Sequence, residues 1–244
     1  MSPKVVAVVQ SSYIPWKGYF DLIGRADEFI LYDDRQYTRR DWRNRNLIKT
    51  SGGTQWLTIP VQVRGRYLQR IDETLVRDPA WTVRHWETLR HVYAASPHFD
   101  RYASQLQELY RGLASEPRLS VINRRLLELI CGLLGIETPI SWSTEYAATG
   151  DRTGRLVSLC RAAGATVYLS GPSARAYLDE SMFAASGIDV EYMDYDGYPE
   201  YPQLHPPFEH RVSVLDLLFN VGDEAPAYLK NAGQPKRSPG RNPS

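Results

Sequence analysis

Residues 5–34 read as strand, loop, helix and strand, which is the unit from which parallel α/β sheets are built. Val5 to Val9 is an apolar run without alternation, as expected for a strand that is covered on both faces. Gly18 and the apolar residues after it predict a short helix, and Phe29 to Tyr32 predicts a second strand. We therefore predict a βαβ unit whose sheet lies at the centre of the fold.

Two acids, Asp33 and Asp34, follow directly on the second predicted strand. Ligands of open α/β sheets bind at the carboxyl ends of the strands, so we expect residues 10–19 and 33–36 to line one crevice. Paired carboxylates can have one pKa raised, which suits a general base. The alternative is that the two acids cap a turn or pair with Arg43 and Arg45.

Composition limits the classes of protein that this chain can belong to. Its 244 residues, 43% hydrophobic and 23% charged, suffice for one large domain, with or without a helical insertion. A net charge of +1 argues against a general nucleic-acid coat or a membrane-surface protein, so any basic patch must be local. No stretch approaches the roughly 18 apolar residues of a membrane span, and there is no apolar signal region, so we expect a cytoplasmic protein. We expect Cys131 and Cys160 to be buried thiols.

A basic segment follows the acid pair. It packs six cations around Tyr37 and Trp42, namely Arg35, Arg39, Arg40, Arg43, Arg45 and Lys49. Guanidinium groups beside aromatic rings and an amide commonly hold a phosphate or carboxylate next to a ring or sugar, which predicts a phosphorylated or otherwise anionic small-molecule substrate. The alternative is a solvated charged loop. After a turn at residues 51–53, Gln55 to Val63 reads as a strand in which Pro60 requires an edge or bulged position.

From Trp81 to about Gly135 the apolar spacing predicts three consecutive amphipathic helices. We interpret residues 79–137 as a helical insertion between a first half of the α/β core, residues 1–78, and a second half, residues 138–230. His85 lies on the apolar stripe of the first helix, where it is either a core histidine or a catalytic base. The other histidines show no ligand spacing, so we expect no metal site formed by the protein.

The second half returns to the strand and helix pattern. Strands are predicted at Pro139–Ser143, Thr166–Leu169 and Ile188–Met193, with a helix over Thr153–Ala163. The fold class is thus α/β: a Rossmann-like, mostly parallel sheet flanked by helices, with an inserted helical subdomain.

A loop of small residues, Ser170 to Ser173, should open a further helix. A helix N-terminus offers backbone N–H groups to an anion, although such a loop can also simply cap a crossover.

The last part of the chain carries three expectations. Tyr195 to Phe208 is too rich in Tyr and Pro for a solvent linker, so we expect it to fold back over the crevice. Val212 to Phe219 predicts a short apolar helix. Residues 231–244 have the composition of a disordered tail.

Several long motifs of unusual composition resemble the WbqC-like family over nearly the whole chain. They are Gln10–Phe20, Asp33–Asp34 with Gln36, Trp42–Arg45 with Lys49, Thr153–Arg155, Tyr168–Pro172 with Tyr177–Leu178, Tyr201–Leu204 and Leu215–Asn220. The family takes its name from bacterial surface-polysaccharide gene clusters, and the resemblance implies work on an amino sugar or a similar activated metabolite. It implies no settled reaction.

These motifs and segments define the candidate site residues. We predict catalytic roles for Asp33, Asp34 and His85. We predict substrate contacts for Gln10, Tyr13, Trp16, Gly18, Tyr19, Gln36, Arg43, Asn44, Arg45, Lys49, Ser170, Gly171, Ser173, Tyr201 and Gln203.

A second resemblance concerns the loop Pro15–Tyr19. It sits where adenylate-forming enzymes of the nucleotidyltransferase and pantothenate-synthetase type, which share the HUP-type fold, carry a His-x-Gly-His signature after the first strand. Here Trp16 and Tyr19 replace the two histidines, which normally stabilise charge on the phosphates. The altered loop does not support ATP use, and the cofactor stays unassigned.

Two functional hypotheses of different classes follow. The first is a transferase or ligase that joins an acyl or aminoacyl group to an amine of an amino sugar, such as a sugar nucleotide, or of a similar metabolite. The second is a non-catalytic accessory protein that binds a sugar nucleotide or glycan in a polysaccharide or natural-product pathway. A tRNA-borne or carrier-protein-borne acyl donor is compatible with the first, whereas membrane or general nucleic-acid binding is not expected.

Overall fold

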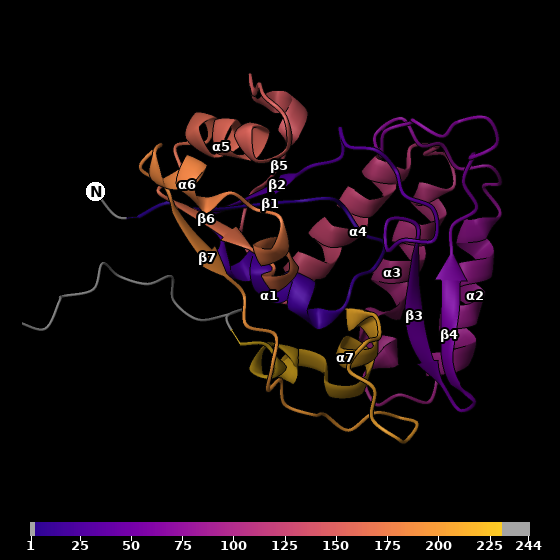
Figure 1. Cartoon of the computed structure of the whole chain (residues 1–244). Coiled ribbons are helices and arrows are strands. Elements are labelled where there is room, and N and C mark those ends of the chain that lie inside the picture. Colours follow the sequence, from indigo (N-terminus) through magenta and orange to yellow (C-terminus); the bar gives the residue numbers. More distant parts are fainter. Residues whose placement is uncertain (1–2, 231–244) are drawn as a thin grey trace, which may run out of the picture.

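Five parallel strands form the central sheet of the computed structural model, which describes residues 3–230; the tail predicted to be disordered, residues 231–244, lies outside the described residues. In the order β5–β2–β1–β6–β7 they are Ile140–Trp142, Glu28–Leu31, Val5–Val9, Val167–Ser170 and Asp189–Tyr192 (Figure 1). β1 is the central strand and pairs in parallel with β2 and β6. The predicted βαβ unit and its central position are confirmed.

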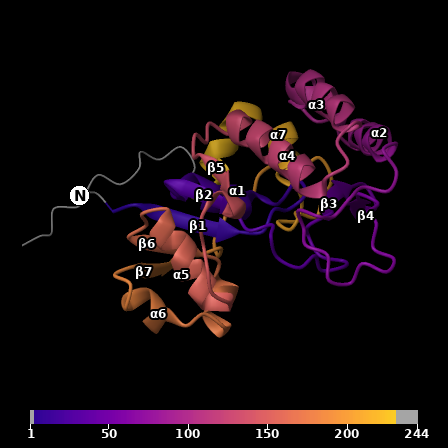
Figure 2. The same cartoon turned by 90° about the horizontal axis from the view of Figure 1, so that it is seen from above.

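Side chains of β1 alternate between two hydrophobic layers. Val6 and Val8 pack with Leu159 and Phe183 on one face, whereas Ala7 belongs to the core on the other face. The helices are α1 (Lys17–Arg25), α2 (Trp81–Tyr93), α3 (Phe99–Leu113), α4 (Leu119–Leu133), α5 (Arg152–Ala162), α6 (Glu180–Ala184) and α7 (Val214–Val221). Figure 2 shows α1, α4 and α7 on one side of the sheet and α5 and α6 on the other. Covering helices on both faces confirm the Rossmann-like α/β class.

A separate hairpin carries part of the basic segment. It consists of β3 (Arg45–Thr50) and β4 (Gly53–Thr58), paired antiparallel and joined by the predicted turn. The sequence did not predict β3, because buried Asn46 and Lys49 mask the usual apolar alternation. The strand predicted over Gln55–Val63 ends early, at Thr58, just before Pro60, which lacks an N–H group.

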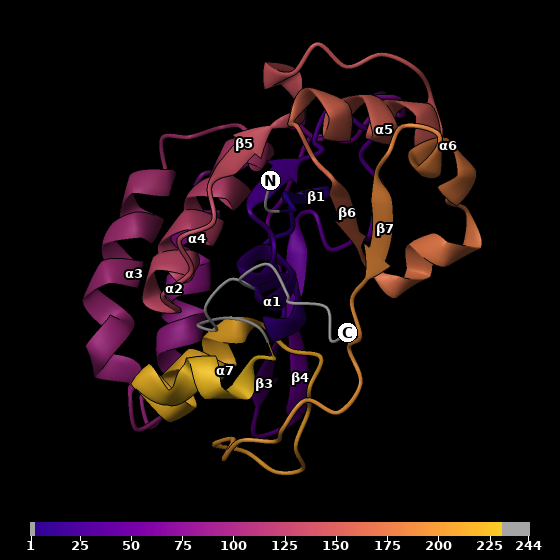
Figure 3. The same ribbon diagram turned by 90° about the vertical axis from the view of Figure 1, so that its left-hand side faces the viewer.

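The three predicted helices α2, α3 and α4 are present, and Gly135 ends the third with a φ of 69°. They lie together beside the hairpin (Figure 3) and share one hydrophobic core with strand residues Phe29 and Leu31. α4 also contacts the loops of the sheet directly, since its Asn123 side chain donates to Ser11 Oγ at 2.9 Å. The domain boundaries at residues 78 and 137 stay a prediction.

The buried carboxylate of Asp216 joins α7 to two other parts of the molecule. It accepts hydrogen bonds from Tyr93 of α2 at 3.0 Å and from Tyr201 and Gln203 at 2.8 and 2.9 Å. Tyr201 and Gln203 belong to the segment that we call the strap, residues 194–211, which connects β7 to α7. Burial raises the pKa of Asp216, while these donors and the nearby Lys49 oppose the rise.

Replacing Asp216 should therefore loosen the strap and α7 together. We expect Asp216→Ala to lower the free energy of unfolding by about 3 kcal/mol, because it leaves several buried donors without an acceptor. Asp194→Ala, which removes an exposed ion pair with Lys230 and a hydrogen bond from the Asp196 amide, should cost clearly less. Urea unfolding followed by circular dichroism measures both, and equal losses would contradict the assignment.

Candidate functional site

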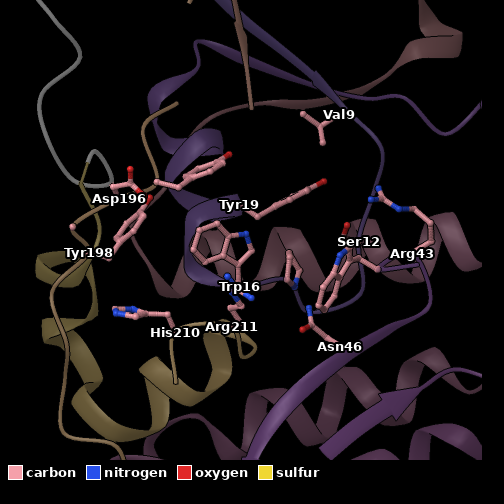
Figure 4. A pocket seen from close by; sticks show the side chains of 14 residues that line it. Val9, Ser12, Trp16, Tyr19, Arg43, Asn46, Asp196, Tyr198, His210 and Arg211 are labelled. Carbon is pink, nitrogen blue, oxygen red and sulfur yellow. The ribbon is translucent and has the colours of Figure 1, made fainter. Parts of the chain in front are cut away.

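A cavity of about 660 Å³ opens at the carboxyl end of β1. It lies next to the point where the strand order reverses between β1 and β6, which is the usual ligand position in open α/β sheets. Its walls come from the β1–α1 loop, the hairpin side and the strap (Figure 4). They comprise Val9, Ser12, Pro15, Trp16, Tyr19, Trp42, Arg43, Asn46, Tyr195, Asp196, Gly197, Tyr198, His210 and Arg211.

The Trp16 indole forms one wall of the cavity. Its ring meets Tyr195 and Tyr198 edge to face, with centroids 5.1 and 5.8 Å apart. It also covers Gly18 so closely that a Cβ atom added there would stand 2.3 Å from Trp16 Cζ2. The indole therefore leaves room only for a glycine at position 18. Because Tyr195 and Tyr198 of the strap line the cavity, the strap folds back over the crevice as the sequence predicted.

Arg43 and Tyr19 define the opposite corner of the cavity. Arg43 donates to the carbonyl groups of Gln10 and Ser11 at 2.7 and 2.9 Å, and the Tyr19 hydroxyl also donates to Gln10. These bonds fix the loop after β1. The Arg43 Nε atom is buried and has no hydrogen-bond partner among residues 3–230, although it lies 3.6 Å from Asp41 Oδ2 in an ion pair. A guanidinium group beside aromatic rings suits an anionic ligand.

His210 contributes the only imidazole among the described wall residues of the cavity. Partial burial lowers its pKa, and the positive charge of nearby Lys17 lowers it further. Lys17 lies beneath the strap, where it donates to the Pro199 carbonyl at 2.9 Å and faces the rings of Tyr198 and Tyr201. Burial lowers the pKa of Lys17 to about 8, against the opposing charge of Asp21. A neutral His210 can accept a proton near neutral pH.

Three of the predicted substrate contacts line the cavity, namely Trp16, Tyr19 and Arg43. Gln10 contributes its carbonyl group, and Gly18 supports the indole. Tyr201 and Gln203 point to Asp216 and anchor the strap from behind.

Asp33 and Asp34 do not face this cavity, so the expectation of one shared crevice is wrong. They line a separate hollow of about 210 Å³ at the ends of β2 and β5. Asp33 accepts from Ser11 N at 2.7 Å and from Ser120 Oγ of α4 at 2.5 Å, and burial raises its pKa. Asp34 bonds to Ser143 and to Arg155, and the lowered pKa of Asp34 reflects these partners against an opposing effect of burial.

His85 lies in an aromatic core between α2 and α3. It shares a hydrogen bond of 2.8 Å with the buried Tyr13 hydroxyl, which in turn bonds to Tyr110. Burial lowers the pKa of His85 to about 4. The structure therefore places both His85 and Tyr13 away from the cavity.

The remaining residues of the basic segment are divided between core and surface. Buried Asn44 donates to the Ile59 carbonyl and accepts from Tyr37, and buried Lys49 lies in the hairpin. Arg45 covers the Trp56 ring at 4.0 Å on the outer face, and Gln36 donates to the Tyr67 carbonyl.

The loop Ser170–Ser173 leads into a helix as predicted, and this helix is a five-residue 3₁₀ helix, Pro172–Ala176. The chain turns at Tyr177, and α6 begins anew where Asp179 accepts from Ser181 N. Five residues in a 3₁₀ turn give little dipole for an anion. Ser170, Gly171 and Ser173 are not among the cavity walls.

Sequence reasoning missed several wall residues. Lys17, which lies beneath the strap rather than in the wall, falls inside the family motif Gln10–Phe20 and so had a signal, whereas the wall residue His210 was judged only on metal spacing. Ser12, Trp42, Asn46, Asp196 and Arg211 also contribute to the site.

The sequence of this chain matches a known protein family over most of its length. The WbqC-like protein family matches residues 10–228, which include every segment of the cavity wall except Val9. The chain belongs to the WbqC-like family. A protein of Mycobacterium tuberculosis, described as uncharacterized, is 54% identical over 231 residues, which is 95% of this chain and 100% of the relative. No solved structure matches the chain.

Three further observations describe this WbqC-like chain. Within residues 3–230, no cluster of three or more His, Cys, Asp or Glu side chains is arranged to hold a metal ion. None of the helices in the same range is long and apolar enough to cross a membrane. Both cysteines are buried and free, as predicted.

Gly18→Ala tests the close contact with Trp16. We expect it to cost about 1 to 3 kcal/mol of stability and to change the near-UV circular dichroism, because the indole must move. Gly132→Ala in α4 meets no atom within 4 Å and should be neutral or stabilising by up to about 1 kcal/mol. If both variants gain stability equally, the indole does not rest on Gly18.

His85→Gln tests whether His85 is a core residue. The folded pKa of about 4 lies below the ordinary 6.5, so the native state binds fewer protons between these values and its stability falls as pH decreases through them. The group's contribution to this fall is about 3 kcal/mol. Stability curves from pH 7 to 4 should be flatter for the variant than for the wild type; parallel curves would contradict the buried neutral imidazole.

Proposed function

We propose that this WbqC-like protein is a cytoplasmic biosynthetic enzyme that transfers an acyl or aminoacyl group to an amine of an amino sugar or a comparable activated metabolite. The observation that carries this proposal is the cavity at the end of β1, which combines aromatic walls, two arginines and a titratable imidazole. Such walls suit a ring beside an anionic group, as in a sugar nucleotide.

The walls suggest how a substrate is placed. A sugar ring or base packs against Trp16 and Tyr198, while a phosphate or carboxylate meets Arg43 or Arg211. Asn46 supports the loop rather than the ligand, since its amide donates to the carbonyl groups of Tyr13 and Ile14.

A base is needed because an amine at neutral pH is largely protonated and must lose a proton before nitrogen attacks a carbonyl. We assign this role to His210, since its lowered pKa favours the neutral imidazole and it lines the cavity. Asp33 and Asp34 remain the second choice because Ser120, Ser143 and Arg155 already bind their oxygens.

The second candidate is a non-catalytic protein that binds a sugar nucleotide or glycan. It is supported by the burial or pairing of Asp33, Asp34 and His85, which leaves the cavity with few groups for proton transfer. Aromatic and arginine walls would serve binding alone equally well.

Turnover by the pure protein separates the two candidates. With amino-sugar nucleotides and activated acyl donors we expect amide formation, detected by mass spectrometry, and kcat/KM should fall as pH decreases through the pKa of His210, which lies below the ordinary value for histidine. His210→Asn should lower kcat by roughly 10²- to 10⁴-fold with substrate still bound. Asp33→Asn is the matched control; loss of turnover there with an active His210→Asn would assign the base to the carboxylate.

Calorimetric binding without turnover for the wild type would favour the second candidate.

A further inference from the structure

The positive charge of the chain is concentrated in one stretch. Residues 35–70 contain nine arginines or lysines and a single acid, Asp41, whereas the whole chain has 29 basic and 28 acidic residues. The stretch forms the hairpin and the loops before and after it, which lie at one end of the molecule (Figure 1). The nearly neutral total therefore conceals a strongly basic end and an acidic remainder.

Five arginines of this stretch make no ion pair with any other residue among residues 3–230. They are Arg39, Arg40, Arg45, Arg64 and Arg66. Some other exposed arginines, such as Arg70, Arg84 and Arg90, are paired with nearby acids, whereas Arg111 and Arg125 make no ion pair among residues 3–230 but lie outside this basic stretch. Uncompensated cations that lie close together repel one another and favour an anionic partner.

Exposed aromatic rings lie between these arginines. Trp42 and Trp56 are 43% and 42% exposed, their ring centroids are 5.3 Å apart, and Arg45 covers Trp56. Tyr67 is 72% exposed, and the Arg39 guanidinium lies 5.1 Å from its ring. Arg45 also donates to the Arg40 carbonyl, which joins the two groups into one surface. We call this surface, with Arg64 and Arg66, the arginine face.

The arginine face continues into the candidate active site. Trp42 contacts Trp56 on the outside and also lines the cavity at the end of β1. Its main chain is fixed to the β1–α1 loop, because the Tyr13 amide donates to the Trp42 carbonyl at 3.0 Å. A polymer held on the arginine face can thus deliver its end into the cavity past Trp42.

We propose that the arginine face binds an RNA whose single-stranded 3′ end carries the acyl group that the cavity transfers. This inference rests on the proposed function and names its donor class. Single-stranded RNA presents a phosphate chain and flat bases, which match arginines interleaved with exposed indole and phenol rings. An acidic protein surface would match the charge, but the exposed rings lie under guanidinium groups rather than in an apolar groove.

The transfer balances without another reactant. The amine nitrogen attacks the carbonyl carbon of the ester that links the acyl group to the terminal ribose. The C–N bond forms, the C–O bond to the ribose breaks, and the proton lost by the amine ends on the released ribose hydroxyl. The products are an amide and an RNA with a free 3′ end.

The test measures binding of fluorescently labelled, unacylated bulk tRNA to the full chain by anisotropy, so it is independent of catalysis. We expect Arg39→Glu combined with Arg66→Glu to weaken binding at least about tenfold near 0.1 M salt and to reduce the salt dependence. The matched control is Arg111→Glu combined with Arg125→Glu, two exposed arginines on α3 and α4 that make no ion pair with any residue from 3 to 230. This control changes the net charge equally and should alter binding less than about twofold.

A second variant separates recognition of the single-stranded end from general charge. Trp56→Ala should weaken binding of intact tRNA by about 5- to 100-fold through loss of stacking. It should leave binding of tRNA trimmed of its single-stranded 3′ nucleotides unchanged. Circular dichroism and melting temperatures verify that every variant folds.

The outcomes distinguish this inference from the proposed function. Equal losses in the paired arginine variants, or binding of an acidic carrier protein but not of tRNA, would overturn the arginine face as an RNA site. If tRNA binds through the arginine face but no acyl transfer occurs from any donor, the RNA site stands and the proposed function fails. If small activated esters are turned over and tRNA is not bound, the enzyme stands and the RNA donor is wrong.

Discussion

The backbone carbonyl groups of the loop after β1 no longer pair within the sheet and need other hydrogen-bond donors. Side chains from distant parts of the molecule supply these donors. The carbonyl groups of Gln10 and Ser11 accept hydrogen bonds from the Arg43 guanidinium. Those of Tyr13 and Ile14 accept hydrogen bonds from the Asn46 side-chain amide. Buried polar groups without partners are costly, so these bonds dictate where the hairpin sits against the sheet. Asn123 completes the arrangement by donating to the Arg43 carbonyl from α4. The cavity exists because this loop is held rigidly open beside Trp16.

Strong local signals made the central sheet predictable. The β-branched run of β1 and the apolar stripes of α2, α3 and α4 fix their own secondary structure, and Gly135 ends α4 where expected. β3 was not predictable in this way, because Asn46 and Lys49 are buried through contacts with distant segments that the local pattern does not contain. Pro60 stopped β4 earlier than its apolar neighbours suggested.

The site was only partly predictable for a related reason. Trp16 and Arg43 follow the strand end that topology marks as the ligand edge, so rules of the fold locate them. Asp33 ends the neighbouring strand, but Ser120 of α4 turns its carboxylate away, and no sequence pattern reports that tertiary contact. His210 reaches the cavity because the strap crosses the edge of the sheet, where hydrogen bonds to Lys17 and Asp216 hold it in place.

The cavity wall joins segments from opposite ends of the sequence: Lys17 and Pro199, which hold the strap in place, are 182 residues apart. The N-terminal part of the chain is synthesised first, so Trp16 emerges long before Tyr195 and Tyr198, the rings that it packs against. Until the strap docks, the indole has no aromatic partners and His210 is not in place. The cavity therefore depends on the strap, and a chain that ended after β7 would contain every strand of the sheet but lack this wall.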